Sequence, residues 1–167
     1  MKGARKDPRH RAREAALQIL YHWEIGRTDV ASAADTFFGL QWADAEGPPD
    51  DLRTFATELA HDTVRHLDRA DTLIAETAER WRPERMAVLD RLILRMAATE
   101  LMRAVTTPAG RSSNRGPGDA GGRNDAAPPA VVINEALELA RTFSTEESVK
   151  FINGMLDAIR KKLEASV

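Results

Sequence analysis

The sequence predicts an all-α protein, and three features support this fold class. Through most of the chain, apolar residues recur every three or four positions, the spacing of a helix with one buried face. No segment shows the sustained polar–apolar alternation of a half-buried strand. Apolar residues make up 43% of the 167 residues and aromatic residues only 5%, so we expect an aliphatic core of packed helices. A chain of this length forms one domain or two closely packed halves.

The first helix is predicted to run from about Pro8 to Ile25. Asp7 belongs to the residue types that cap a helix N-terminus, and proline is favoured at the first helical position. Gly26 is the expected end, because glycine is common just past the last helical residue. The buried side is expected to contain Ala12, Ala16, Ile19, Leu20 and Trp23.

The next helices follow short breaks in the pattern. A short apolar segment, VASAADTFF (residues 30–38), precedes a loop that ends in Gly-Pro-Pro. Asp50 is expected to cap a third helix that ends near His66. A fourth begins at Leu67 and extends to about Trp81, shortly before the next proline.

A fifth helix is predicted from PERMAVLDRLILRMAATELMRA (residues 83–104). Its apolar positions fall on one side and its charged positions mostly on the other, as in a helix that covers a core. The residues expected to face inward are Leu89, Ile93, Met96 and Leu101. Those expected to face mostly outward are Asp90, Arg91, Arg95 and Glu100.

Residues 106–129 differ in composition from the rest of the chain. This segment holds five of the ten glycines and four of the eight prolines, and it has almost nothing to bury. We therefore interpret it as a flexible loop. Its three arginines, Arg111, Arg115 and Arg123, either contact an anionic partner or belong to a tolerated surface insertion.

Two helices complete the chain. VVINEALELARTF (residues 131–143) is apolar around much of its circumference and is therefore expected to be central. Ser144 and Glu147 match a capping box, with serine at the N-cap and glutamate three residues later. The last helix then buries one broad apolar arc. This arc comprises Val149, Ile152, Met155, Leu156, Ile159 and Leu163.

The last helix contains the dipeptide Asn153-Gly154, and Asn-Gly usually indicates a β-hairpin turn. A glycine inside a helix costs about 1 kcal/mol relative to alanine, so we expect a compensating role. Gly154 falls just beyond the edge of the apolar arc, where a missing side chain permits close approach. Two interpretations stay open, namely close packing on a neighbouring helix and contact with a partner.

The composition and motifs exclude several kinds of site. Without cysteine there is no disulfide, thiolate nucleophile or cysteine-based zinc site. No glycine-rich phosphate-binding motif is present, and Glu58 and His61 lack the second Glu-x-x-His copy that a di-iron site requires. We expect no enzyme, cofactor or metal site. No apolar run reaches the ~18 residues of a membrane span, and the N-terminal residues lack the apolar core of a signal peptide, so a soluble cytoplasmic protein is expected.

A basic arm at the N-terminus is the strongest candidate for function. The formal net charge is −2, yet residues 2–13 carry six lysines and arginines against one aspartate. Such arginine-rich segments bind RNA through its phosphates and base edges, and the alternative is a solvated tail. The basic residues are Lys2, Arg5, Lys6, Arg9, Arg11 and Arg13, and His10 adds a charge that depends on pH.

Three longer blocks of the sequence are specific enough to identify a family. They are RHRAREAALQILYHWE (residues 9–24), WRPERMAVLDRLILRMAATEL (81–101) and VVINEALELARTFSTEESVKFINGMLD (131–157). Together they resemble the NusB family of transcription antitermination factors. The resemblance implies a single NusB-like, all-helical domain over residues 1–167, with about seven helices in two packed bundles. These bundles are expected at about residues 8–82 and 83–165, with the flexible loop at 106–129.

The resemblance also implies a non-catalytic RNA-binding adaptor. With NusE, a small-subunit ribosomal protein, such proteins bind boxA RNA of ribosomal RNA operon leaders. The complex then helps RNA polymerase to read through terminators. The implied RNA-binding residues are Arg5, Lys6, Arg9, His10, Arg11, Arg13, Glu147 and Lys150, and the implied NusE-binding residues are Tyr21 and Asp90. Phe151 is either a platform on which a base stacks or a core residue, and we favour the core.

The alternative to an antitermination factor is a part of a ribosomal RNA cytosine methyltransferase. NusB-like domains also occur at the N-terminus of certain enzymes of this class. Such an enzyme requires a cofactor domain and a catalytic cysteine. The chain would then be a detached RNA-binding domain of the enzyme. The sequence leaves open whether the free protein is a monomer or a homodimer.

Overall fold

The computed structural model describes residues 7–41, 49–78, 82–106 and 126–167. Within these ranges the regular structure is helical and contains no strand, which confirms the all-α fold class. The elements are α1 (Pro8–Gly26), α2 (Val30–Gln41), α3 (Asp50–Arg65), α4 (Leu67–Thr77), the short 3₁₀ turn η1 (Pro83–Arg85), α5 (Val88–Thr106), α6 (Pro129–Phe143) and α7 (Glu146–Ala165).

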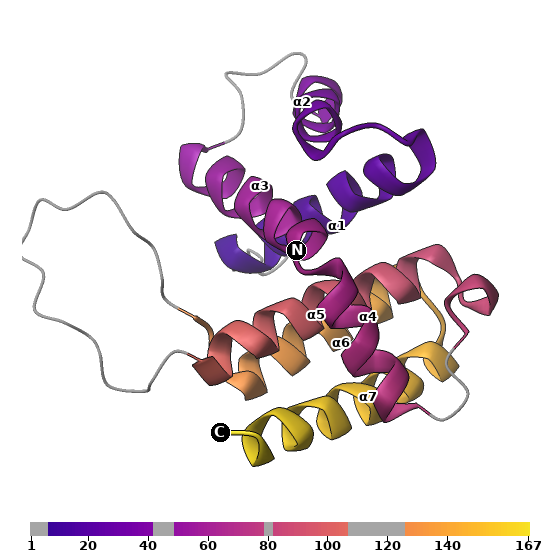
Figure 1. The fold of residues 1–167 in the computed structure, drawn as a ribbon. Coiled ribbons are helices and arrows are strands. Elements are labelled where there is room, and N and C mark those ends of the chain that lie inside the picture. The colour runs from indigo at the N-terminus through magenta and orange to yellow at the C-terminus, as the bar shows by residue number, and fades with distance from the viewer. Residues whose placement is uncertain (1–6, 42–48, 79–81, 107–125) are drawn as a thin grey trace, which may run out of the picture.

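The helices form two groups that pack against each other (Figure 1). Helices α1, α2 and α3 contact one another in the first group, and α4, α5, α6 and α7 form the second. Helix α4 packs against α5 and α7, whereas the expected boundary near residue 82 would place it with the N-terminal bundle. The division of the chain at that residue stays a prediction.

Helix α5 is the central helix of the molecule. It contacts α1 and α3 of the first group and α4, α6 and α7 of the second, and every residue from Leu92 to Met102 is buried. The prediction that the helix at residues 131–143 would be central is therefore wrong. That helix, α6, leaves one side in solvent, where Val131 is 42% exposed.

Four charged residues of α5 lie largely inside the protein, so the prediction that they face mostly outward is also wrong. These residues are Asp90, Arg91, Arg95 and Glu100. Neighbouring helices supply partners for them. Arg95 donates hydrogen bonds of 2.8 and 2.9 Å to Asp71 of α4, and Arg91 donates one of 2.8 Å to Glu24 of α1. Charged groups are buried stably only when they are paired in this way.

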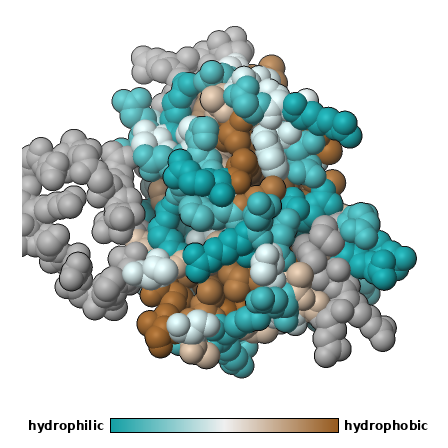
Figure 2. Space-filling view, in the orientation of Figure 1, coloured by the Kyte–Doolittle hydropathy of each residue, from teal (hydrophilic) through white to brown (hydrophobic). Residues whose placement is uncertain are grey.

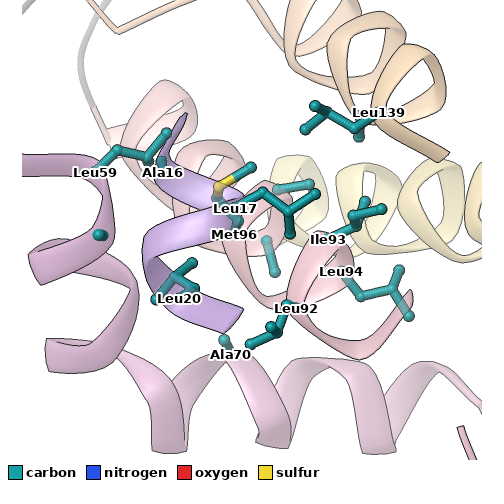
Figure 3. Packing of buried hydrophobic residues seen from close by; sticks show 14 of the residues in the cluster. Ala16, Leu17, Leu20, Leu59, Ala70, Leu92, Ile93, Leu94, Met96 and Leu139 are labelled. Atoms are coloured by element: carbon teal, nitrogen blue, oxygen red, sulfur yellow. The ribbon is translucent and has the colours of Figure 1, made fainter. Parts of the chain in front are cut away.

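The apolar core joins the two groups (Figure 3). Side chains of α1, including Leu17, pack against Leu59 of α3 and Met96 of α5. All three residues are at most 2% exposed. Full burial of a side chain of this size stabilises a fold by about 1.5–3 kcal/mol, so this packing fixes α1 against both groups.

The ends of α1 and the start of α3 agree with the sequence in one place and differ in two. The Asp7 side chain caps α1 as predicted. The residue in the left-handed conformation after α1 is Arg27 (φ 49°), whereas Gly26 is still helical. Asp50 is the first residue of α3, and Pro49 occupies the N-cap position without a side-chain hydrogen bond. An acidic residue in the first helical turn still stabilises the helix dipole.

Some expectations fall outside the described residues. They concern Trp81 of the predicted fourth helix, which ends at Thr77 in the structure, and residues 107–125 of the predicted loop. Among the helices that are described, none is both long and apolar enough to cross a membrane. The face in Figure 2 is largely hydrophilic, with hydrophobic side chains in its upper centre and at its lower left.

Candidate nucleic-acid interface

The basic arm continues into the first turn of α1. The Asp7 carboxylate accepts a hydrogen bond of 2.8 Å from the backbone N–H of Arg9, so the helix begins immediately before the arginines. Arg9 and Arg11 are exposed. Lys2, Arg5 and Lys6 precede residue 7 and lie outside the described residues. The structure therefore presents at least two guanidinium groups to solvent from a rigid helix end.

Arg9 is held in place by an aromatic ring of α3. Its Cζ lies 5.3 Å from the centroid of the Phe55 ring, and Cζ of Arg13 lies 5.4 Å from the same centroid. Each contact of this kind contributes about 0.5–1 kcal/mol at an exposed site. The ring restricts where the Arg9 side chain can point, which reduces the entropy lost when it binds an anion. Local sequence spacing gives no sign of Phe55, because it belongs to a different helix.

Arg13 is buried, unlike the two arginines before it. Its guanidinium forms a two-pronged contact with the Glu100 carboxylate of α5, with N···O distances of 2.9, 3.0 and 3.3 Å. Only 2% of Arg13 is exposed. Burial alone would lower the pKa of the Arg13 guanidinium, but the hydrogen bonds and charge of Glu100 outweigh burial and raise it above its ordinary value. In this conformation Arg13 anchors α1 to α5 and does not reach the surface.

His10 lies between two carboxylates. Its Nδ1 is 2.6 Å from Glu135 Oε2 of α6, and its Nε2 is 3.0 Å from Glu14 Oε1 of α1. A neutral imidazole has one N–H and can donate to only one of these groups, whereas the imidazolium donates to both. The His10 side chain is 11% exposed, so it mainly links α1 to α6 beside the arm.

The start of α7 presents a second set of predicted residues. Glu147 and Lys150 are exposed, and Phe151 is 44% exposed. The preference for Phe151 as a core residue is therefore wrong. Its ring is accessible for stacking, which contributes about 1–3 kcal/mol per base.

The predicted capping box at this helix start is wrong. Thr145 is the N-cap residue, and its Oγ1 accepts a hydrogen bond of 3.1 Å from the backbone N–H of Ser148. Ser144 instead donates its hydroxyl hydrogen to Asp90 Oδ1 of α5. Glu147 is thus one position too early to be the glutamate of a capping box, and it has no capping role.

Gly154 lies one turn further along α7 and faces open space. A Cβ placed on it would meet no atom within 4 Å among the described residues outside its own helix segment. Of the two interpretations, close packing on a neighbouring helix is therefore wrong. Gly154 is exposed, as are Lys150 and Phe151 of the same helix.

The two residues predicted to bind NusE differ in exposure. Tyr21 is 41% exposed and lines a shallow, mainly apolar cavity of about 240 Å³, and Ile25, one turn later, is 57% exposed. The cavity lies between α1 and the adjoining ends of α5 and α6. Its other lining residues are Leu17, Gln18, His22, Leu89 and Phe143.

Asp90, in contrast, is 7% exposed. Its carboxylate accepts hydrogen bonds from the hydroxyls of Ser144 and Ser148, the latter at 2.6 Å. It therefore fixes the α6–α7 connection beside the cavity. Asp90 follows Leu89, which lines the same cavity as Tyr21, but Asp90 itself is buried.

Metal-ligating side chains do not gather in the part of the chain that the structure describes. Across the described ranges, no three histidine, aspartate or glutamate side chains gather as a metal site would require. The carboxylates of Glu14 and Glu135 approach opposite nitrogens of the His10 ring and so do not converge on a common point. The geometry suits binding of an anionic polymer at the helix starts and of an apolar group beside Tyr21.

Comparison with known proteins identifies the family. The NusB family model matches residues 10–112 and 123–161, which is most of the chain. The chain belongs to the NusB family. The transcription antitermination protein NusB of Solibacter usitatus is 41% identical over 155 residues, which are 93% of this chain and 90% of that protein. The NusB of Koribacter versatilis is 38% identical over 157 residues, which are 94% and 91% of the two chains.

Solved NusB structures share the fold. T. maritima NusB has a TM-score of 0.70 at 27% identity, and the match covers 97% of this chain and 99% of that one. A NusB chain from a complex of the antitermination factors NusB and NusE with double-stranded RNA also has a TM-score of 0.70. It is 22% identical over 93% of this chain and 97% of that one. The NusB-like fold expected from the three sequence blocks is therefore confirmed.

Proposed function

We propose that this NusB protein is a transcription antitermination factor that binds boxA-type RNA of ribosomal RNA operon leaders together with NusE. The complex promotes read-through by RNA polymerase. The protein acts in the cytoplasm as a non-catalytic adaptor. The observation that carries the proposal is the pair of exposed arginines, Arg9 and Arg11, at a rigid helix start in a chain of this family.

The arm supplies phosphate contacts and α7 supplies a base contact. Arginine binds phosphate through a fork of N–H donors, and Phe55 holds the Arg9 side chain ready for this contact. Lys150 and Phe151 lie on the exposed face near the start of α7. Phosphate contacts set affinity, and base contacts set sequence preference. We leave Arg13 out of the RNA surface because its guanidinium is buried against Glu100.

NusE is proposed to bind beside Tyr21. The cavity of about 240 Å³ and the exposed Ile25 next to it can take an apolar side chain of the partner. An aromatic residue beside an apolar cavity is a common anchor in protein interfaces. Asp90 acts there by fixing the connection between α6 and α7, through its hydrogen bonds to Ser144 and Ser148.

The alternative, a detached domain of a ribosomal RNA cytosine methyltransferase, has less support. The first curated relatives are antitermination proteins, and the matches cover nine-tenths or more of their length. Whether the free protein is a monomer or a homodimer is a separate question, which sedimentation of the free chain would answer.

The test is binding to boxA-type RNA and to a scrambled RNA, with and without NusE, at two salt concentrations. We expect tighter, sequence-selective binding with NusE. For single-stranded RNA the salt slope falls by about 0.7 for each phosphate that the protein no longer binds, so Arg9→Ala with Arg11→Ala should lower it by about 1.4. The control, Arg141→Ala with Lys161→Ala, removes the same charge from exposed positions of α6 and α7.

Two results would overturn the proposal. Unchanged RNA affinity in the Arg9 and Arg11 double variant would refute the arm as the RNA-binding site. The antitermination role would be refuted if the parent protein binds RNA weakly and its affinity depends on neither the RNA sequence nor NusE.

A further inference from the structure

A second cavity with basic side chains lies where α3, α4 and α5 meet. Its volume is about 260 Å³, and it opens to solvent. The α3–α4 junction contributes Asp62, His66 and Arg69, and the C-terminal half of α5 contributes Thr99, Arg103 and Thr106. Neither the predicted arm nor the predicted NusE-binding residues include any of these positions.

Among the described residues that line this cavity, Asp62 is the acidic one, and its charge is already neutralised. The Asp62 carboxylate forms an ion pair with Arg103 of α5 and another, at 3.3 Å, with Arg65. The imidazole Nδ1 of His66 lies 2.9 Å from the backbone oxygen of Asp62. This nitrogen must carry the hydrogen, because a carbonyl oxygen can only accept. These contacts hold Asp62, His66 and Arg103 in place around the cavity.

Arg69 completes the set of basic side chains that line the cavity. It is exposed, and none of the described residues gives it a hydrogen bond or an ion pair. A guanidinium group presents five N–H donors, so an unpaired one beside the Arg103–Asp62 pair leaves the cavity with excess positive charge. Such a cavity favours an anion over a cation or an apolar group.

The cavity is continuous with the surface around the arm. Arg103 lines both this cavity and a small hollow that Arg9, Arg13 and Phe55 also line. Along α3, Phe55 and His66 are eleven residues apart, which is about 16 Å at 1.5 Å per residue. The protein surface along one side of α3 therefore passes three arginines in turn: Arg9 of α1, Arg103 of α5 and Arg69 of α4. Basic grooves of this kind follow the backbone of single-stranded nucleic acid.

We propose that this cavity binds a phosphate group, and that in the RNA complex the phosphate belongs to the backbone of the strand held by Arg9 and Arg11. Arg69 provides the free donors, and Arg103, held by Asp62, provides the neighbouring charge. The RNA part of this inference rests on the proposed function. Continuity with Arg9 favours an RNA phosphate over an acidic protein segment as the occupant.

The first test is the salt dependence of RNA binding by Arg69→Gln. This variant keeps a long polar side chain at an exposed position, so it should fold normally, which circular dichroism verifies. We expect the salt slope to fall by about 0.7, the value of one phosphate contact to a single strand. The control, Lys161→Gln, removes one charge from the exposed side of α7 and should leave the slope unchanged.

The second test uses inorganic phosphate and the free protein. Titration followed by ¹⁵N–¹H NMR should shift the backbone amides around His66 and Arg69 in the parent and not in Arg69→Gln. Phosphate-dependent shifts with an unchanged RNA slope would identify free phosphate as the ligand and overturn the RNA part. Absence of both effects would overturn the inference entirely. If the parent binds no RNA, the proposed function fails, and the phosphate titration still decides whether the cavity binds phosphate.

Discussion

Replacing Glu100 by glutamine should destabilise the protein strongly. The substitution keeps the shape of the side chain and removes its charge, which leaves the Arg13 guanidinium buried without a counter-ion. The two side chains are 3% and 9% exposed, so water cannot take the place of the carboxylate. The contact joins α1 to α5, the central helix.

The magnitude follows from this burial. Removing one partner of a buried pair typically costs 3–5 kcal/mol, because the remaining charge stays desolvated. Glutamine still offers one oxygen as an acceptor, so we expect about 3 kcal/mol, the lower end of that range. For a protein of this size, 1 kcal/mol shifts Tm by about 2–4 °C, so Tm should fall by about 6–12 °C.

The measurement is urea unfolding and thermal unfolding followed by far-ultraviolet circular dichroism. A matched control is Asp35→Asn, which breaks the Arg53–Asp35 pair on the surface, where the side chains are 48% and 76% exposed. That change should cost less than about 1 kcal/mol. In a double-mutant cycle with Arg13→Met, the double variant should be more stable than the sum of the single effects by about 0.5–3 kcal/mol.

Two outcomes would refute this reasoning. A loss below about 1 kcal/mol for Glu100→Gln would place the pair in the class of solvated surface contacts. Additive effects of Arg13→Met and Glu100→Gln would mean that the two side chains do not stabilise each other. Either result would leave the position of α1, and with it the arm, without its proposed anchor.

Three further predictions concern α7. Gly154→Ala should raise the free energy of unfolding by about 0.5–1 kcal/mol, because a Cβ there meets no atom within 4 Å and alanine favours the helix; a lower Tm would contradict this. Thr145→Ala should lower stability by about 1 kcal/mol through loss of the N-cap, and an unchanged urea midpoint would show that the cap contributes nothing. Phe151→Ala should weaken boxA RNA binding at least about fivefold, from stacking of at least 1 kcal/mol, with little change in Tm. Unchanged RNA affinity would rule out a stacked base.

The sequence predicted the elements whose determinants are local. Asp7 and the proline after it set the start of α1, and the apolar arc of α7 predicted its buried face, of which Ile152 and Leu156 are fully buried. The exposure of Phe151 could not be read from the sequence, because the residue lies at the edge of that arc. Its burial depends on whether a neighbouring helix reaches it.

The errors occur where a distant segment decides the outcome. Two adjacent hydroxyl residues, Ser144 and Thr145, are equally suited to cap α7. Asp90 binds the first of them, so Thr145 becomes the cap. Likewise, most charged residues of α5 lie inward because residues distant in sequence bring their hydrogen-bond partners, and nothing near Glu100 in the sequence indicates Arg13.

The polar residues buried along α5 limit how this protein can evolve. Arg13 with Glu100 and Asp71 with Arg95 are pairs from different helices. Loss of either member of the Arg13–Glu100 pair leaves a desolvated charge, and loss of Asp71 leaves the largely buried Arg95 with weaker compensation, so selection removes most such single substitutions. Paired changes survive more readily, and positions in contact then vary together among relatives. We therefore expect covariation between residues 13 and 100, and between residues 71 and 95. Such covariation would reveal from sequences alone that α1 and α4 pack on α5.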